Sequence, residues 1–547
     1  MIRLSEIKLT LAQAQQPQAV LRAAAARILG LADSELAGVQ VFKRSFDARK
    51  AELTAVYIID VALADPAREA AVLAGLRGRP NIAATPDMQW HPPVPVQTAP
   101  LSQRPVVVGF GPCGIFAALV LAQMGLRPIV LERGKKVRER TRDTWGLWRR
   151  RVLDPESNVQ FGEGGAGTFS DGKLYSQVKD PRHLGRKVMN EFVQAGAPEE
   201  ILYVAHPHIG TFKLVKVVEN MREQITALGG EIRFQQRVTD LLIEEGPDGK
   251  QLRGVTVLNQ ASGAVTELRT EHAVLALGHS ARDTFEMLHE RGVSMEAKPF
   301  SIGFRIEHPQ SVIDRARWGR HAGHPLLGAA DYRLVHHASN GRSVYSFCMC
   351  PGGTVVAATS EPQRVVTNGM SQYSRNERNA NAGMVVGIDP RDYPGGPLAG
   401  VELQRKLESN AYVLGGGNYN APGQLVGDFI AGQPSSQLGG VEPSYTPGVT
   451  LGDLHGALPA FAIAALREAL PVFGQRIKGF DMPDAVLTGV ETRTSSPLKI
   501  ARDGDYRSVN VRGLYPAGEG AGYAGGILSA GIDGIRVGEA VALSLMG

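Results

Sequence analysis

The residues best suited to chemistry in this chain lie in three glycine-rich segments, and the first has the spacing of a dinucleotide-binding turn. GFGPCG at 109–114 matches the pattern GxGxxG, and an acid, Glu132, follows Gly114 by 18 residues. Gly109 permits a tight turn, Gly111 lets the backbone approach a pyrophosphate, and Gly114 allows a helix to pack closely on a strand. The N-terminus of that helix would then face the phosphates.

The pattern GxGxxG discriminates little by itself, because GEGGAG at 162–167 and GAGYAG at 520–525 also match it. Only the copy at 109–114 follows a Val-rich strand and opens an apolar helix. Glu132 ends the next predicted strand, where its carboxylate would accept hydrogen bonds from ribose hydroxyls and repel a 2′-phosphate. This placement favours FAD or NAD over NADP; the alternative is a glycine turn beside a surface glutamate.

A second acid, Glu519, favours FAD over NAD. In GLYPAGEGAGYAGG, at 513–526, it ends a predicted strand and is followed by glycines that open a helix. Such a segment could hold a ribityl chain and direct backbone amides toward a flavin ring, where a helix N-terminus would stabilise anionic reduced flavin. An NAD domain has no comparable need for this distant acid and glycine cluster; the alternative is a glycine-rich site of helix packing.

The third segment, NVQFGEGGAGTFSDGKLYSQ at 158–177, has five glycines between Gly162 and Gly172, too many for a helix. It is predicted to be a loop wrapped against a ligand. Lys173 and Tyr175 flank this loop and could reach the flavin or the substrate, although a solvent-exposed lysine is the commoner outcome.

Cys348 and Cys350, in VYSFCMCPGG, are predicted to lie on a strand that ends in a turn, with both side chains on one face. They could accept electrons from a flavin, or they could be ordinary buried cysteines. Two residues so spaced on a regular strand have Cα atoms about 6.5–7 Å apart, at the upper edge of disulfide geometry. The sequence therefore predicts that this pair is not an obligatory electron carrier.

The elements that must position these residues predict an α/β fold with a Rossmann-like FAD-binding domain, made discontinuous by an inserted α+β substrate domain. The strand–helix–strand unit around 109–132 and the strand and helix after residue 513 lie far apart in sequence, on either side of the insertion. An N-terminal α+β domain with ferredoxin-like order precedes them. The predicted boundaries are 1–90 for the ferredoxin-like domain, 91–105 for a Pro-rich linker, 106–294 and 486–547 for the FAD-binding domain, and 295–485 for the insertion.

Composition restricts the function classes. The chain has 547 residues, three cysteines and a formal charge of +5, and it shows neither a signal peptide nor a membrane-spanning run, which predicts a soluble cytoplasmic protein. Residues 133–151 carry nine basic and two acidic side chains, so anionic phosphates are plausible neighbours. No metal is predicted, because the histidines and the CxC pair lack metal-site spacing.

Several longer strings together resemble a known family: GFGPCG, NVQFGEGGAGTFSDGKL, LALGHSARDTF, KPFSIGFRIEHPQ, YSFCMCPGG, GVETRTSSP and GLYPAGEGAGYAGGILSAGIDGI. The chain is similar to the two-dinucleotide-binding-domain flavoproteins of the glutathione-reductase type. Within them it resembles a bacterial group of uncharacterised FAD-dependent dehydrogenases, or NAD(P)/FAD-dependent oxidoreductases. Cys113 stands where the commonest flavoprotein pattern has Ala, and Glu519 where many have Asp.

The resemblance implies that FAD is bound by residues from the turn, the loop and the strand ends described above. These are Gly109, Gly111, Pro112, Cys113, Gly114, Glu132, Arg133, Gly164, Gly165, Ala166, Gly167, Thr168, Val238, Ala276, Gly278, Gly518, Glu519, Gly525, Gly526 and Ile527. No second fingerprint for NAD(P)H is placed between a strand and a helix, so the reductant stays open, with NAD(P)H as a transient donor.

The function predicted is that of an FAD-dependent oxidoreductase that transfers hydride through flavin N5 to or from a small-molecule substrate. The candidate catalytic residues are Lys173, Tyr175, Arg305, Glu491, Arg493 and Tyr523, of which Arg305, Glu491 and Arg493 could equally form structural ion pairs. Two alternatives remain: a flavoprotein that binds or modifies RNA through the basic run, and a non-catalytic redox sensor. The main hypothesis involves no membrane and no nucleic acid, and leaves the oligomeric state open.

Overall fold

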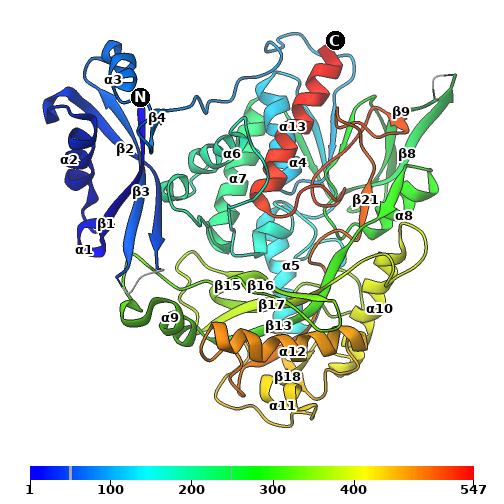
Figure 1. The fold of residues 1–547 in the computed structure, drawn as a ribbon. Coiled ribbons are helices and arrows are strands. Elements are labelled where there is room, and N and C mark those ends of the chain that lie inside the picture. Colours follow the sequence, from blue (N-terminus) through cyan, green and yellow to red (C-terminus); the bar gives the residue numbers. More distant parts are fainter. Residues whose placement is uncertain (49–51, 248, 547) are drawn as a thin grey trace.

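The computed structural model describes residues 1–48, 52–247 and 249–546. An N-terminal unit stands apart from the body of the molecule, which contains a parallel sheet with helices and a larger, mainly antiparallel sheet below it (Figure 1). The chain therefore combines helices and strands in a mixed α/β fold. Within the described part of the chain, no helix combines the length and the hydropathy needed to cross a membrane.

The N-terminal unit has the chain order β-α-β-β-α-β and the strand order β2-β3-β1-β4, all antiparallel, which is the ferredoxin-like order. Its elements are β1 (Ile2–Thr10), α2 (Pro17–Leu29), β2 (Leu36–Asp47), β3 (Thr54–Leu63), α3 (Glu69–Gly75) and β4 (Ile82–Ala84). Alternate residues of β3 from Ala55 to Leu63 are buried, as a half-buried strand requires. Leu21, Ala25 and Leu29 recur every fourth residue on the buried side of α2.

The parallel sheet combines strands from both ends of the remaining chain. Its order is β23-β11-β5-β6-β7, and every neighbouring pair is parallel. The strands are β5 (Val106–Val108), β6 (Ile129–Glu132), β7 (Glu231–Phe234), β11 (Ala273–Leu275) and β23 (Leu514–Pro516). Four of them, all but β7, are buried along their whole length, as expected where helices or further sheets cover both faces.

Helix α4 (Pro112–Gln123) lies at the centre of this layer, against α13 (Ile527–Met546), with α6 (Leu184–Gln194) and α7 (Thr211–Ala227) beside them (Figure 1). Ten consecutive residues of α4 are buried, so the helix is apolar all round. Helix α13 approaches it closely because glycines face it: a Cβ on Gly534 would lie 2.2 Å from the carbonyl oxygen of Cys113. This contact brings the two halves of the parallel layer together.

A smaller sheet lies at the edge of the parallel layer. It contains β8 (Gln236–Gly246), β9 (Gly249–Asn259), β10 (Val265–Arg269) and β22 (Val511–Arg512). Helix α8 (Arg282–Glu290) packs on β8. A two-stranded sheet pairs β12 (Met295–Ala297) with β21 (Leu498–Ile500).

The largest sheet has eight strands and carries the largest hydrophobic core. Its path runs β14-β15-β17-β13-β20-β18-β19, and β16 pairs with β15. The strands are β13 (Phe300–Pro309), β14 (Val335–His337), β15 (Ser343–Ala357), β16 (Thr367–Ser371), β17 (Asn379–Ile388), β18 (Ala421–Leu425), β19 (Val449–Leu451) and β20 (Val486–Glu491). The helices around it are α5 (Val137–Arg150), α9 (Gln310–Trp318), α10 (Ala399–Leu414), α11 (Val426–Ala431) and α12 (Ala460–Arg476).

Strand β20 differs from the sequence-based division, which places 486–547 with the cofactor domain. It pairs antiparallel with β13 and with β18 inside the eight-stranded sheet. The chain therefore leaves this sheet only after Glu491. Local sequence gives no sign of this, because a fully buried strand has the same apolar composition in either sheet.

The contact between α13 and α4 gives a stability prediction. Replacing Gly534 with Ala puts a methyl group against the backbone of Cys113, which cannot move aside as a side chain can. We expect Gly534→Ala to lower the free energy of unfolding by about 1–3 kcal/mol, measured by urea denaturation. Gly504→Ala is the control, because its Cβ would meet nothing within 4 Å; equal stability of the two variants would contradict the prediction.

A candidate cofactor-binding site

One pocket lies at the carboxyl ends of the parallel strands, where ligands bind in open α/β sheets. The chain segments that follow β5, β6, β11 and β23 all line it. Residues of the large sheet, from β15, β16 and β20, complete the opposite wall. The pocket therefore lies between the parallel layer and the eight-stranded sheet.

Most of the residues that the sequence assigned to a cofactor line this pocket. They are Gly109, Gly111, Pro112, Cys113, Glu132, Arg133, Gly165, Ala166, Gly167, Val238, Ala276, Gly278, Gly518, Glu519, Gly526 and Ile527. Of the candidate catalytic residues, Lys173, Glu491 and Arg493 also line it.

The remaining candidates lie behind the pocket wall, where the structure gives them other contacts. Gly114 packs on the turn, since a Cβ there would lie 2.0 Å from the carbonyl oxygen of Gly109. A Cβ on Gly164 would lie 2.1 Å from the Thr168 hydroxyl, so these two residues pack on each other. Gly525 lies beside the Glu519 side chain, where its Cβ would come 3.3 Å from a carboxylate oxygen.

The two candidate tyrosines are also outside the pocket lining. The Tyr523 hydroxyl donates a hydrogen bond to the Ile500 carbonyl (3.0 Å), and the guanidinium of Arg502 stacks on its ring at 3.7 Å. Tyr175 is exposed, with its ring centroid 5.1 Å from that of His206. Tyr523 thus supports the backbone, and Tyr175 lies at the surface.

The glycine turn between β5 and α4 forms a cradle for a ligand. Gly109 has φ +101°, and a Cβ there would lie 2.2 Å from the Ala276 carbonyl oxygen, so only glycine fits. Gly111 is the N-cap of α4 and provides no side-chain cap. A Cβ on Gly111 would meet only the Gly165 backbone, at 3.5 Å. The first amides of α4 therefore face a groove that a side chain at Gly111 would partly fill.

The Glu132 carboxylate connects three backbone segments around this turn. It accepts hydrogen bonds from the amides of Phe110 (2.8 Å), Gly134 (2.8 Å) and Gly162 (2.9 Å). The side chain is buried, so these bonds replace the water that the carboxylate has lost. Glu132 thereby fixes the glycine turn relative to the loop that begins at Gly162.

The loop from 158 to 172 is held by a fully buried arginine. The Arg140 guanidinium donates hydrogen bonds to the carbonyls of Asn158, Val159 and Glu163, each at 2.7 Å. Burial lowers the pKa of Arg140 to about 10, so the side chain remains charged at neutral pH. The loop is therefore a fixed part of the pocket, and its form depends on Arg140.

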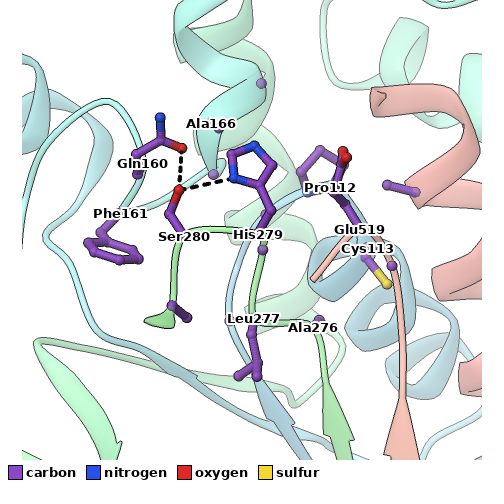
Figure 2. Close-up of a pocket in the computed structure, with 18 of the residues that line it drawn as sticks. Pro112, Cys113, Gln160, Phe161, Ala166, Ala276, Leu277, His279, Ser280 and Glu519 are labelled. Atoms are coloured by element: carbon purple, nitrogen blue, oxygen red, sulfur yellow. Dashed lines mark hydrogen bonds between the residues drawn. The ribbon is translucent and has the colours of Figure 1, made fainter. Parts of the chain in front are cut away.

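Sequence reasoning missed a polar network on the floor of the pocket, formed by Gln160, His279 and Ser280 (Figure 2). The Ser280 hydroxyl donates to Gln160 Oε1 (3.1 Å) and lies 3.0 Å from His279 Nδ1. Burial, together with the charge of Arg493, lowers the pKa of His279 to about 3, which keeps the ring neutral. The sequence contained a signal for this network, since His279 and Ser280 lie four and five residues after the end of β11, beyond the carboxyl edge of the parallel sheet.

Arg493 belongs to a buried ionic cluster that joins the two sides of the pocket. Glu408 of α10 accepts hydrogen bonds from Arg282 (2.7 and 3.0 Å) and from Arg493 (2.9 and 3.1 Å). Burial alone would raise the pKa of Glu408, but the two arginines lower it well below its ordinary value. Arg493 also donates to the Ser280 hydroxyl at 3.1 Å, so it positions the pocket floor.

Arg305 is fully buried behind the wall formed by β15. Its guanidinium donates to Asn381 Oδ1 (3.0 Å) and to the Cys348 carbonyl (2.8 Å), and lies 3.3 Å from the Glu491 carboxylate. Glu491 reaches the pocket, where Thr367 donates to its other oxygen at 3.2 Å. Burial raises the pKa of Glu491, and Arg305 opposes that effect.

The predicted geometry of the cysteine pair is wrong. No turn follows Cys350, because β15 continues to Ala357. The register with β17 shifts on either side of Cys350, and Cys348 has φ +45°. The strand is therefore bulged at the cysteines, and the spacing of a regular strand does not apply.

The basic run at 133–151 is largely engaged within the protein. Arg133 pairs with Glu156 and Asp283, Lys135 with Asp143 and Asp154, and Arg138 with Glu219, while Arg140 holds the loop described above. A sequence count of charges could not show these pairings, which join residues from 8 to 150 positions apart.

Comparison with known proteins assigns the family. Residues 299–494 match the family model described as "FAD-dependent protein, C-terminal domain-like", and residues 1–62 match a domain of unknown function, DUF8436. An uncharacterised protein of Clostridium beijerinckii is 45% identical over 541 residues, which cover 98% of each chain. The chain therefore belongs to the same family as that protein, and its residues 299–494 resemble the C-terminal domain of FAD-dependent proteins.

Solved flavoenzyme structures resemble the chain only weakly. The open conformation of a flavocytochrome c3 fumarate reductase is 13% identical, with a TM-score of 0.36 over 81% of this chain and 79% of that one. The 3-ketosteroid Δ1-dehydrogenase of Sterolibacterium denitrificans is 11% identical, with a TM-score of 0.34 over 80% and 98%. At TM-scores of 0.36 and 0.34, these similarities do not indicate an activity for this chain.

The buried cluster gives a second stability prediction. Glu408→Gln removes the carboxylate that Arg282 and Arg493 share; Arg282 keeps its ion pair with Glu361, while Arg493 loses its direct carboxylate partner. We expect a loss of about 3–5 kcal/mol at pH 7. Because its partners depress the pKa of Glu408, its contribution is complete above the ordinary value of 4.5 and is lost as the pH falls through the depressed pKa. The stability difference between wild type and variant should therefore shrink in acid.

The control for this measurement is Glu402→Gln, which alters an exposed ion pair with Arg405 (2.8 Å) on the same helix. We expect a cost of less than about 1 kcal/mol there. Urea denaturation at pH 7 and at several acidic pH values measures both variants, and a Glu408→Gln protein as stable as the control would contradict the prediction.

Proposed function

We propose that the chain is an FAD-dependent oxidoreductase that acts on a small molecule held between the cofactor and the wall formed by β15, β16 and β20. The observation that carries the proposal is the convergence of the glycine turn, Glu132, Glu519 and titratable wall residues on one pocket. FAD would supply hydride transfer at flavin N5. The assignment to the glutathione-reductase type, and the division into a discontinuous cofactor domain and an inserted substrate domain, are part of the same proposal.

The diphosphate would be held by backbone rather than by charged side chains. Helix α4 begins at Pro112, beside the groove at Gly111, and the positive end of the helix dipole favours an anion there. Gly165 lies directly opposite, since a Cβ on it would come 2.8 Å from Gly111 Cα. A groove this narrow suits a chain of phosphates better than a ring.

Glu132 retains capacity for a ribose hydroxyl. A carboxylate offers about four lone-pair positions, and three amides occupy three of them. Among the residues that the structure describes, Oε2 accepts a hydrogen bond only from Phe110, so one position on this oxygen can accept a hydroxyl proton. Its negative charge would repel a 2′-phosphate, which supports FAD over NADP.

Glu519 would bind the ribityl part of the cofactor. It lines the pocket close to Pro112 and Cys113 (Figure 2). Its carboxylate has a long hydrogen bond from the Gly526 amide, at 3.4 Å. Burial raises the pKa of Glu519 to about 7, so the side chain can both donate to and accept from hydroxyl groups near neutral pH.

Glu491 is the candidate for holding a proton at the reacting end. It reaches the pocket from the end of β20, and burial raises its pKa, so it keeps a proton to higher pH than an exposed glutamate does. Lys173 brings a positive charge into the same region from the other side. Together they could exchange a proton with a substrate and orient an anionic one.

The engaged charges of the basic run support this function over RNA binding. Arg133, Lys135 and Arg138 already pair with carboxylates, which leaves them less free to bind phosphates along an RNA backbone. A small-molecule substrate in the pocket needs none of them.

We expect the purified protein to be yellow and to release FAD, rather than FMN, when heated or acidified, as identified by chromatography. Gly111→Val should lower the FAD content at least tenfold, because a branched side chain enters the groove of the diphosphate. The fold should survive, since the new Cβ meets only ordinary contact distances.

The control is Gly504→Val, at a site open to solvent, which should keep wild-type FAD content. Stoichiometric FAD in a folded Gly111→Val protein would show that this turn is not the phosphate site. A well-folded wild-type chain that releases no FAD would overturn the proposed function.

NAD(P)H is proposed as a transient electron donor. We expect anaerobic mixing with NADH or NADPH to bleach the flavin absorbance of the FAD-loaded protein, followed by stopped-flow spectroscopy. If neither NADH nor NADPH bleaches the flavin, the electron donor is the substrate or another protein. That result would leave the proposed FAD site unchanged.

A further inference from the structure

Cys348 and Cys350 lie at a bulge that faces the reacting end of the pocket. The register of β15 with β17 shifts between Phe347 and Cys350, and Cys348 adopts a left-handed conformation, with φ +45°. Such a conformation is uncommon for a residue other than glycine and marks a locally constrained backbone. The bulge directs Cys348 into the pocket lining, while Cys350 is fully buried behind it.

The bulge also turns the Cys350 thiol back toward Cys348. Cys350 Sγ donates a hydrogen bond to the Cys348 carbonyl oxygen, at 3.4 Å. A regular strand would separate the two Cα atoms by about 6.5–7 Å, and the left-handed residue removes that constraint. The spacing of a regular strand therefore no longer argues against a disulfide between these two residues.

Two cations stabilise a thiolate at this position. The neighbouring Cys350 thiol and the charges of Lys173 and Arg305 lower the pKa of Cys348, against the effect of burial. Arg305 Nη2 lies 3.8 Å from Cys350 Sγ. Lys173 Nζ has no hydrogen-bond partner among the described residues and lies 3.3 Å from Asp171, which two bonds from Arg375 already engage.

We propose that Cys348 and Cys350 form a redox-active dithiol that exchanges two electrons with the FAD of this pocket. The inference rests on the proposed function, because it requires FAD to be bound there. In the oxidising direction, the two S–H bonds break and one S–S bond forms. Two electrons and two protons pass from the thiols to FAD, which becomes FADH2, and the reverse reaction reduces the disulfide.

The two cysteines have different parts in this exchange. Cys348 reaches the pocket and carries the stabilised thiolate, so it is the residue that meets the flavin or an incoming disulfide. Cys350 is fully buried behind the pocket wall, so its part is to form the S–S bond with Cys348. Arg305 and Lys173 are positioning residues, since they act through the charge of the thiolate.

The test uses FAD-loaded protein that has been oxidised with diamide and then freed of it. Under anaerobic conditions, dithionite is added in steps while the flavin absorbance is recorded. We expect wild type to take up four electrons per FAD, with flavin colour returning after the first additions as electrons pass to the disulfide. The variants Cys348→Ser and Cys350→Ser should take up two.

Met349→Leu is the matched control, because it changes the buried residue between the cysteines at nearly constant volume. It should take up four electrons, as wild type does. Alkylation and mass spectrometry give a second readout that needs no variant. In wild type, both cysteines should be protected in the oxidised sample and alkylated after the first two electrons.

The outcomes separate the two proposals. Wild type that binds FAD, takes up only two electrons and shows no 348–350 disulfide overturns the dithiol and leaves the FAD site intact. A disulfide that forms with diamide but stays oxidised while the flavin is reduced also overturns it. A chain that binds no FAD overturns both the proposed function and this inference.

Discussion

The hydrogen bonds of one buried carboxylate, Glu132, hold together the end of the pocket that contains the glycine turn. A carboxylate buried at a strand end is costly unless donors surround it, and here the donors are the amides of Phe110, Gly134 and Gly162. The need to satisfy this charge fixes the glycine turn, the end of β6 and the start of the long loop relative to one another. Together with the hydrogen bond from the Gly164 amide to the Phe110 carbonyl (2.8 Å), these bonds hold the loop beside the turn, across the narrow gap between Gly111 and Gly165.

A second set of buried charges aligns the wall with this end. Arg282 begins α8, just after β11 of the parallel sheet, while Glu408 lies on α10 and Arg493 follows β20 of the large sheet. The hydrogen bonds that Arg282 and Arg493 donate to Glu408 join the parallel layer to the large sheet. Because these groups are buried, a shift of one layer relative to the other would leave a charge without its partner, which is costly. The bulged strand and Glu491 are thus held at a set place relative to the glycine turn, although they come from another sheet.

The sequence revealed those parts of the site whose signals are local. Gly109, Gly111 and Glu132 stand at fixed offsets within one strand–helix–strand unit, so composition and spacing were enough to place them. The hydrogen bond between Gln160 and Ser280 could not be predicted from the sequence, because it forms through the packing of segments that lie 120 residues apart. The bulge at Cys348 was hidden for the same reason: its register is set by β17, and a bulge leaves no reliable mark in the composition of its own strand.

The two ends of the pocket use different physical means, and this difference has a chemical consequence. At the end with the glycine turn, backbone amides and the Glu132 carboxylate form the groove. One oxygen of that carboxylate already accepts two hydrogen bonds, so the arrangement of these groups is fixed before any ligand enters. At the reacting end, the lining includes Lys173, Cys348 and Glu491, whose neighbours or burial shift their pKa values in different directions. The backbone amides beside Gly111 carry no titratable group, whereas the lowered pKa of Cys348 and the raised pKa of Glu491 bring both of these groups closer to the neutral range. Burial raises the pKa of Glu519, between the two ends, to about 7, so a change of pH near neutrality alters the charge in the middle of the pocket as well.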